Sequence, residues 1–199
     1  MSNIRPMCSE DIESVVRVHM DAFQGFFLTF LGPTFLTEFY EGVCEDHSGI
    51  ALIYEDHFVL GFVVGTVQPS GFYKRLIQER WWKFGLSSLW PLIRKSSIIP
   101  RLLRALNLPD HVSKMQPRTG TLMSLAVMNG CQGRGIGKQL VSSFLEHSRK
   151  KGVELVNLTT DAADNEPTNE FYRKMGFTCA KTFATPEGRL MNEYFIRVS

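Results

Sequence analysis

A glycine-dense segment, Gln132-Gly-Arg-Gly-Ile-Gly-Lys138, carries the strongest chemical signal in this sequence. It follows an apolar run typical of a strand and precedes an amphipathic pattern typical of a helix. Glycine lets the backbone approach a ligand closely, and the free N–H groups at a helix start attract an anion such as pyrophosphate. Arg134 and Lys138 add positive charge to the positive end of the helix dipole. The segment is therefore predicted to bind an anionic group.

Two familiar phosphate-binding motifs fit this segment poorly. A Walker A loop requires Lys followed by Ser or Thr, whereas Lys138 is followed by Gln139. The dinucleotide fingerprint requires GxGxxG, whereas Gly133, Gly135 and Gly137 are spaced GxGxG and lie late in the chain. A glycine-rich turn without a ligand is the remaining alternative, and the strand and helix that flank the segment disfavour it.

The elements that must position this segment alternate between strand and helix. Apolar and β-branched runs predict strands at residues 3–5, 49–54, 58–67, 120–127, 153–160, 178–184 and 189–198. Helical spacing predicts helices from an N-cap at Ser9, from Pro33 toward Cys44, from the glycine segment to Gly152, and from Pro167 to Gly176. We expect one α/β (α+β) domain over residues 1–199, with a mixed, largely antiparallel twisted sheet flanked by helices.

Composition narrows the class of protein. A chain of 199 residues that is 44% hydrophobic and 21% charged is typical of a globular domain. The first residues lack the apolar core of a signal peptide and no run of 18 apolar residues occurs, so a cytoplasmic protein without a membrane span is expected. The scattered cysteines suggest neither disulfides nor a metal site, and are expected as buried or half-buried free thiols: Cys8, Cys44, Cys131 and Cys179.

The glycine segment and its surroundings resemble the GNAT family of N-acetyltransferases. The family's loop pattern is Gln/Arg-x-x-Gly-x-Gly/Ala, which Gln132, Gly135 and Gly137 match position by position. The resemblance extends to Leu125-Ala-Val127 before the loop, and to Asn165 and Tyr172-Arg-Lys-Met-Gly-Phe177 after it. It covers nearly the whole chain apart from roughly residues 68–118 and implies a GNAT-like sheet. The residues outside the resemblance are expected to form a helical insertion between strands 3 and 4.

The resemblance implies a site for acetyl-CoA as co-substrate. Backbone groups of the strand would hold the pantetheine arm beside a bulge near Val127, and backbone N–H groups of the loop would hold the pyrophosphate. Asn165 would contact the arm, and the Tyr172 hydroxyl would donate a proton to the departing thiolate. A structural tyrosine is the alternative for Tyr172. The implied cofactor-binding residues are Leu125, Ala126, Val127, Gln132, Gly133, Arg134, Gly135, Ile136, Gly137, Lys138 and Asn165.

The group that removes a proton from the acceptor amine stays unassigned. An alkyl amine with a pKa of about 10.4 is almost fully protonated at pH 7, so some group or water chain must take the proton. Members of the family often use a Glu on the strand before the loop, but Thr121-Leu-Met-Ser-Leu125 has no carboxylate. Asp161, Asp164 and His111 are weak candidates, and each is more simply a solvated loop residue or a helix cap.

A basic and aromatic insertion at about residues 69–118 interrupts the family pattern. It holds all three tryptophans and, from Lys74 to Arg118, ten Lys or Arg against two Asp or Glu. One hypothesis is a lid whose arginines meet an acidic acceptor: Arg75, Arg80, Arg94, Arg101 and Arg104. A peripheral membrane contact and simple packing on the domain are the alternatives, and no motif for nucleic acid accompanies the charge.

These features predict an acetyl-CoA-dependent N-acetyltransferase that acts directly on a primary amine of a small molecule, with an amino sugar or a nucleotide-linked amino sugar as the suggested acceptor. The aromatic segment from Phe23 to Pro33 either lines the acceptor pocket or packs in the core. A protein N-terminal or lysine acetyltransferase is one alternative function. A non-catalytic acyl-CoA sensor is another, because the strand lacks a carboxylate. No metal is expected, and monomer and homodimer both stay open.

Overall fold

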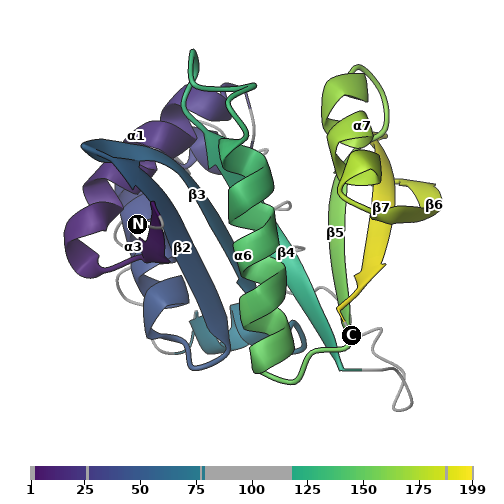
Figure 1. Ribbon diagram of the computed structural model, residues 1–199, viewed down its shortest axis with the longest axis horizontal. Coiled ribbons are helices and arrows are strands. Elements are labelled where there is room, and N and C mark those ends of the chain that lie inside the picture. Colours follow the sequence, from purple (N-terminus) through teal and green to yellow (C-terminus); the bar gives the residue numbers. More distant parts are fainter. Residues whose placement is uncertain (1–2, 26, 77, 79–117, 187, 199) are drawn as a thin grey trace.

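The computed structural model describes residues 3–25, 27–76, 78, 118–186 and 188–198 (Figure 1). Its elements match the predicted order within a few residues, except that the short helix α2 was not predicted. They are β1 (Ile4–Pro6), the 3-10 helix η1 (Ser9–Asp11), α1 (Ile12–Ala22), α2 (Phe27–Phe30), α3 (Pro33–Glu45), β2 (Gly49–Asp56), β3 (Phe58–Thr66), β4 (Thr119–Val127), α6 (Ile136–Lys150), β5 (Leu155–Asp161), α7 (Glu166–Lys174), β6 (Thr178–Ala184) and β7 (Leu190–Arg197).

The described strands form one mixed sheet in the order β1-β2-β3-β4-β5-β7-β6. Every neighbouring pair is antiparallel except β4 and β5, which run parallel. The parallel pairing is short and ends at Thr121 opposite Asn157. Beyond that point β4 and β5 diverge toward the start of α6 (Figure 1). The predicted mixed, largely antiparallel sheet is therefore confirmed, and it opens between its two central strands.

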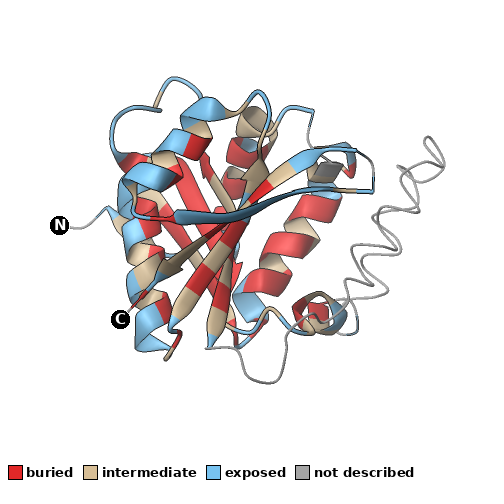
Figure 2. Ribbon diagram, turned by 90° about the vertical axis from the view of Figure 1, so that its right-hand side faces the viewer, coloured by how far each residue is buried: buried red, intermediate tan, exposed pale blue. Residues whose placement is uncertain are grey.

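Helices cover both faces of the sheet, because β3 presents alternate side chains to two cores. Phe62 and Val64 pack with the apolar residues of α1 and α3. Leu60 and Val63 pack on the other face with the apolar residues of α6, such as Leu140. Figure 2 shows the buried positions gathered on the sheet and on the helix faces turned toward it. The two cores hold the elements that border the opening.

The bulge expected near Val127 lies instead at Met123. Val64 pairs with Ser124 and Gly65 pairs with Leu122, so Met123 is the extra residue on β4. Gly65 explains the position of the bulge, because a Cβ on residue 65 would overlap the carbonyl oxygen of Thr121 and the ring of Phe144. The backbones can approach this closely only beside a glycine, and the strand bends at that point.

The predicted N-cap at Ser9 is wrong. Ser9 begins the 3-10 turn η1, and the backbone N–H of Cys8 donates to the Asp11 carboxylate at 2.9 Å. Arg5 holds the same carboxylate through two hydrogen bonds of 2.7 and 2.8 Å. The Arg5 guanidinium lowers the pKa of Asp11 to about 2. The chain thus enters α1 through a turn fixed by an ion pair rather than through a serine cap.

The expectation of buried thiols is wrong for three of the four cysteines. Cys8, Cys44 and Cys179 are exposed, while Cys131 is half-buried, and all four are free. The exposed three lie before η1, in the last turn of α3 and on the outermost strand β6, where packing covers them little. Among the described residues no group of three His, Cys, Asp or Glu side chains is placed to hold a metal.

Only the beginning of the insertion is described, and it packs on the domain. Residues 72–76 are helical, with Phe72 and Leu76 buried in the core beside α1 and α3. Arg75 donates to Asp46 at 2.9 Å and to Ser48 at 2.9 Å, so it serves this packing rather than an acceptor. Residues 79–117 lie outside the described residues. They include Arg80, Arg94, Arg101, Arg104, His111 and the three tryptophans. No helix in the described part is both long and apolar enough to cross a membrane.

Candidate functional site

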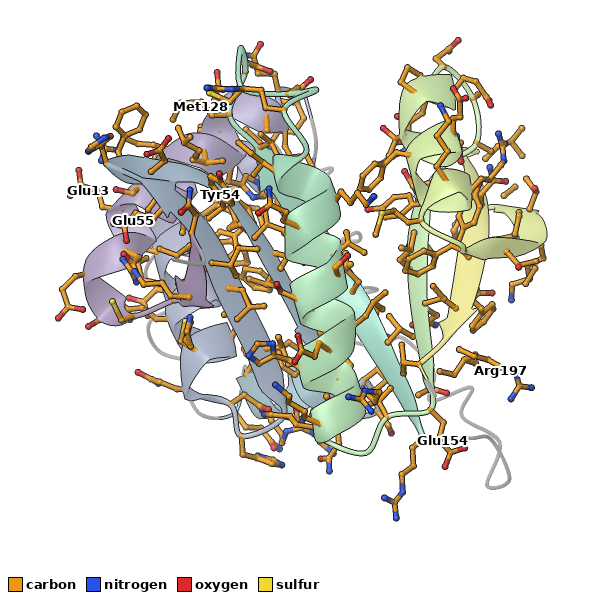
Figure 3. All side chains as sticks on the ribbon, viewed as in Figure 1. Glu13, Tyr54, Glu55, Met128, Glu154 and Arg197 are labelled. Carbon is orange, nitrogen blue, oxygen red and sulfur yellow. The ribbon has the colours of Figure 1, made fainter. Side chains whose placement is uncertain are left out.

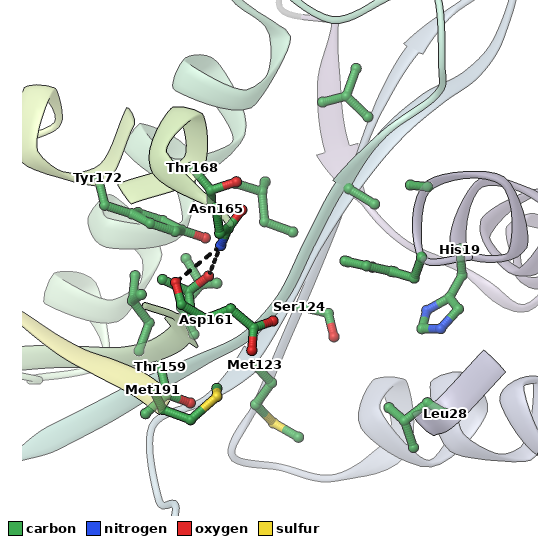
Figure 4. A pocket seen from close by; sticks show the side chains of 18 of the residues that line it. His19, Leu28, Met123, Ser124, Thr159, Asp161, Asn165, Thr168, Tyr172 and Met191 are labelled. Atoms are coloured by element: carbon green, nitrogen blue, oxygen red, sulfur yellow. Dashed lines mark hydrogen bonds between the residues drawn. The ribbon is translucent and has the colours of Figure 1, made fainter. Parts of the chain in front are cut away.

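A pocket of about 490 Å³ opens where β4 and β5 diverge. One wall is the edge of β4, and the opposite wall is the end of β5 with α7 (Figure 4). Residues of α1 and the segment after it close a third side. The lining residues are His19, Ala22, Phe23, Leu28, Leu122, Met123, Ser124, Leu125, Ala126, Val127, Gln132, Leu158, Thr159, Thr160, Asp161, Asn165, Thr168, Tyr172, Arg189 and Met191.

The pocket edge of β4 has free backbone. From Leu122 to Val127 the strand pairs with β3, but among the described residues no strand pairs with its other edge beyond Thr121. Leu125, Ala126 and Val127 all line the pocket, as the sequence predicted. An unpaired strand edge can accept an extended ligand that carries amide groups. This edge therefore fits an arm such as pantetheine.

The glycine segment is open at the start of α6. The first hydrogen bond of the helix runs from the N–H of Gln139 to the carbonyl of Gly135 at 3.1 Å. None of the backbone N–H groups from Gln132 to Lys138 has an acceptor among the described residues. Gly133 and Gly135 adopt φ values of 76° and 78°, and a Cβ built on either would meet nothing within 4 Å. Open space thus faces a row of unpaired amides, as an anion cradle requires.

The charges around this cradle also favour an anion. Arg134 and Lys138 are exposed, and the first turn of α6 contains no acidic residue. The side chain of Ile136 is buried at 3% exposure, so Ile136 offers the ligand only its backbone. The loop is tied to α1 because the Asn129 backbone N–H donates to the Asp21 carboxylate at 2.7 Å. This contact fixes the cradle relative to the pocket.

Helix α7 is anchored to the end of β5 by two asparagines. Asn165 precedes the helix and donates to the hydroxyl of Thr160 at 2.8 Å. Asn169 is fully buried and donates to the carbonyl oxygens of Asp161 and Asn165, each at 2.9 Å. Its own carbonyl accepts from Asn192 at 3.0 Å and from Tyr194 at 2.9 Å. Asn169 is not among the residues predicted from the sequence, because its pattern is that of any polar position of a helix.

Tyr172 projects from α7 into the pocket (Figure 4). Its ring is 6% exposed and packs against Phe171, Phe177 and Tyr194, with centroids 5.1, 5.6 and 6.1 Å away. Burial raises the pKa of Tyr172 well above its ordinary value. The hydroxyl therefore keeps its proton at physiological pH, as a proton donor must.

The three candidate bases are placed differently. Asp161 lines the pocket but is held by Arg189, whose guanidinium donates to it at 2.6, 2.7 and 3.1 Å. Asp164 is exposed in the loop before α7 and is not part of the pocket lining. His111 lies outside the described residues. The pocket thus contains a carboxylate, but one engaged by an arginine.

Two of the lining residues, His19 and Ser124, were not assigned from the sequence. The Nδ1 atom of His19 lies 2.6 Å from the Tyr40 hydroxyl oxygen. In the aromatic segment, Phe23 and Leu28 line the pocket while Leu31 is buried in the core. Both proposed roles of that segment are therefore correct, each for different residues.

Comparison with known proteins shows which family combines these features. The family model described as "Acetyltransferase (GNAT) family" matches residues 13–177, which is most of the chain. The chain belongs to the GNAT acetyltransferase family. The predicted fold and the predicted membership of the GNAT acetyltransferase family are confirmed. Members of the family use an acyl-CoA, typically acetyl-CoA.

Individual relatives are distant. A mycothiol acetyltransferase of Arthrobacter sp. (strain FB24) is 39% identical over 62 residues, which is 31% of this chain and 19% of the relative. The chain thus matches about a fifth of the length of that curated relative. A putative GNAT acetyltransferase from Desulfovibrio desulfuricans has a TM-score of 0.63 at 16% identity, covering 98% of both chains. A ribosomal-protein-alanine N-acetyltransferase from Brucella melitensis has 0.64 at 14%, also covering 98% of both. At these identities the structures show the shared fold alone.

Proposed function

We propose that this GNAT protein transfers an acetyl group from acetyl-CoA directly to a primary amine of a small molecule. The observation that carries the proposal is the adjacency of two backbone features. The free edge of β4 ends at the loop whose unpaired amides face open space in front of Gly133 and Gly135. Coenzyme A needs both features, because its arm carries amides and its pyrophosphate carries charge.

The cofactor residues then take the roles that the sequence predicted. Leu125, Ala126 and Val127 hold the arm through their backbone. The amides from Gln132 to Lys138 hold the pyrophosphate, with Arg134 and Lys138 as added positive charge. Asn165 lines the pocket together with Tyr172 and contacts the arm.

Tyr172 completes the chemistry of transfer. The amine nitrogen bonds to the acetyl carbon as the carbon–sulfur bond breaks, and the departing thiolate takes a proton from the Tyr172 hydroxyl. The amine gives up one proton to the unassigned base or water chain, and the Tyr172 phenolate takes one proton back from solvent. The enzyme is thereby restored, and the proton that the amine loses equals the proton that the thiol gains. A buried tyrosine that stays protonated suits this role.

The acceptor side of the pocket supports a small molecule. Phe23, Leu28 and Met191 give it apolar walls, while the Asp161–Arg189 ion pair gives it polar groups that can contact hydroxyls. The matched curated relative is named for mycothiol rather than for a protein. An amino sugar, which combines an amine with hydroxyls, is therefore the acceptor class we propose.

Release of free thiol from acetyl-CoA, followed with a panel of amines, tests the function. The panel contains glucosamine, glucosamine 6-phosphate, a uridine diphosphate-linked amino sugar, a peptide with a free N-terminal alanine, and an N-terminally blocked peptide with an internal lysine. We expect turnover with an amino sugar. Turnover with the peptides alone would establish a protein acetyltransferase instead, and acetyl-CoA binding without turnover on any amine would indicate a sensor.

A further inference from the structure

The described lining of the pocket contains a single carboxylate, that of Asp161. Asp161 is the last residue of β5, and Figure 4 shows its carboxylate pointing into the pocket toward Ser124 of β4. Other carboxylates lie outside the pocket, such as those of Glu13, Glu55 and Glu154 (Figure 3). A primary amine with a pKa of about 10.4 arrives as an ammonium ion at pH 7 and needs an anionic partner in the pocket. Among the described residues only Asp161 can supply one.

The side chain and the backbone of Asp161 are both held in place. The Arg189 guanidinium donates to Oδ1 from Nε at 3.1 Å and from Nη2 at 2.7 Å, and to Oδ2 from Nη2 at 2.6 Å. Arg189 reaches Asp161 from the position just before β7, the strand that pairs with β5. The backbone carbonyl of Asp161 accepts from Asn165 at 3.3 Å and from Asn169 at 2.9 Å. The carboxylate therefore has a fixed direction in the pocket.

The carboxylate of Asp161 can still bind a ligand. An ionised carboxylate accepts about four hydrogen bonds, and Arg189 supplies two at Oδ1 and one at Oδ2. Oδ2 can therefore accept one more hydrogen bond. The Asp161 side chain is 22% exposed although it is ion-paired, so a ligand in the pocket can reach it. Tyr172 lines the same pocket from α7, so an amine at Oδ2 shares the cavity with the proposed proton donor.

Arg189 changes the effect of this carboxylate on an amine. A carboxylate without a cation beside it would stabilise the ammonium form and oppose the loss of the proton that transfer requires. The Arg189 guanidinium offsets this effect, because it places a positive charge next to the same two oxygens.

No other charge of the described lining acts on this pair at pH 7. The remaining titratable side chains of the lining are His19 of α1 and Tyr172 of α7, while β4 and β7 contribute none. Burial lowers the pKa of His19 to about 4 and raises the pKa of Tyr172, so both side chains are neutral at pH 7. The ion pair therefore sets the local field at the amine.

We propose that Oδ2 of Asp161 binds the nitrogen of the acceptor amine by accepting a hydrogen bond from its N–H. Arg189 is a positioning residue that keeps this contact from trapping the amine as ammonium. The proposal rests on the function proposed above and names the group that binds its substrate. No bond forms or breaks at Asp161. The amine proton leaves to the unassigned base or water chain, while Asp161 holds the nitrogen as it attacks the acetyl carbon.

Asp161→Asn tests the contact, because it keeps the size of the side chain and removes its charge. For the amine with the highest turnover in the panel, KM should rise by about 10-fold, the effect of one lost hydrogen bond to a charged group. The kcat should change much less, and the dissociation constant of acetyl-CoA, measured by calorimetry, should stay the same. An unchanged KM, or a loss that falls on kcat as for a general base, would overturn the proposal.

Asp164→Asn is the matched control for Asp161→Asn. Asp164 is exposed in the loop that follows β5 and does not line the pocket. The control should keep the wild-type KM for the amine. An equal rise of KM in Asp164→Asn would show that negative charge near α7, and not contact with Asp161, attracts the amine, which also overturns the proposal.

Arg189→Gln tests the positioning role through the pH profile. The carboxylate without its cation should raise the pKa of the bound amine, so the rise of kcat with pH should move up by about one unit. At pH 7 both kcat and KM for the amine should fall, because the amine then binds better as ammonium and reacts less often. Arg189→Lys, which keeps the positive charge, should restore most of the wild-type profile. A raised KM with an unshifted profile, as a merely structural role predicts, would overturn the proposal.

Arg173→Gln is the matched control for the loss of an arginine. Arg173 is half exposed on α7 and pairs with Glu166 rather than with a residue of the pocket lining. Its pH profile should be that of the wild-type protein, and the same shift in this variant would contradict the role of Arg189. Failure of the proposed function appears separately, as wild-type protein that releases no thiol with any amine of the panel. Wild-type turnover with unchanged kinetics in Asp161→Asn would overturn this inference alone.

Discussion

Helices α6 and α7 begin at the same end of the sheet, each after one of the two central parallel strands (Figure 1). Their starts are built differently. At α6 the backbone amides have no partners among the described residues and the turn is made by glycine. At α7 the side chains of Asn165 and Asn169 donate to the carbonyl oxygen of Asp161 and so tie the helix start to the end of β5.

The difference shows that a helix start after a parallel strand can either bind a ligand itself or orient the rest of its helix. An open helix start can bind an anion through its backbone amides. Side chains matter there mainly because they must not fill the space in front of those amides. A helix start that is tied to a strand end by side-chain hydrogen bonds fixes the direction of side chains farther along the helix. Tyr172, in the last turn of α7, is such a side chain. The following predictions test this contrast.

The largest effect is expected at the side chain that α7 positions. Tyr172→Phe keeps the ring and its packing but removes the proton donor, so kcat should fall by about 100-fold. The dissociation constant of acetyl-CoA, measured by calorimetry, should stay the same, because the cofactor is held by backbone. Unchanged kcat would mean that the proton comes from another group.

The raised pKa of Tyr172 adds a pH dependence to this prediction. Burial disfavours the phenolate, so the donor stays protonated where a free tyrosine, with a pKa of about 10, begins to ionise. The kcat of the wild-type protein should therefore show no decline from tyrosine ionisation up to about pH 10. A fall with a midpoint near pH 9 would contradict the assignment.

The open start of α6 should be sensitive to any side chain at Gly135. Valine there is strained at a φ of 78° and would project into the space in front of the amides. We expect acetyl-CoA affinity to fall by about 100-fold, or about 2.7 kcal/mol. Gly152→Val is the matched control, since Gly152 has a φ of 80° at the other end of α6. Equal loss of affinity in both variants would show that strain alone is responsible.

The tied start of α7 should respond in stability rather than in affinity. Asn169→Leu keeps a similar volume but leaves Asn192 and Tyr194 without the buried oxygen to which both donate. The free energy of unfolding in urea should fall by about 2–4 kcal/mol. Acetyl-CoA affinity should change much less than in Gly135→Val. Wild-type stability would mean that the network does not anchor the helix.

The smallest effect is expected on the exposed face of α7. Glu166 and Arg173 form an ion pair of 2.6 Å at the surface, with both side chains at least half exposed. Glu166→Gln should leave the urea midpoint and kcat unchanged, because solvent screens such pairs. A clear loss of stability would show that surface contacts, and not the buried asparagines, fix α7.

The sequence alone determined the features that depend on neighbouring residues. The strand and helix periods located nearly every element, and they placed the glycine segment between a strand and a helix. The residues of the cradle are contiguous, so their type and spacing were sufficient to assign the family. The prediction of Ser9 as a helix cap was wrong even though it concerned neighbouring residues. Arg5 and Asp11 hold the entry to α1 through a contact that no local pattern indicates.

Only the tertiary structure decided which distant side chains meet. Arg189 lies 28 residues from Asp161, and Tyr40 lies 21 residues from His19, yet each pair is in direct contact. The bulge at Met123 depends on a glycine in another strand. The physical reason is that a period of hydrophobic residues fixes which face of an element is buried. The packing of separate elements then fixes which polar atoms come within hydrogen-bonding distance on that face.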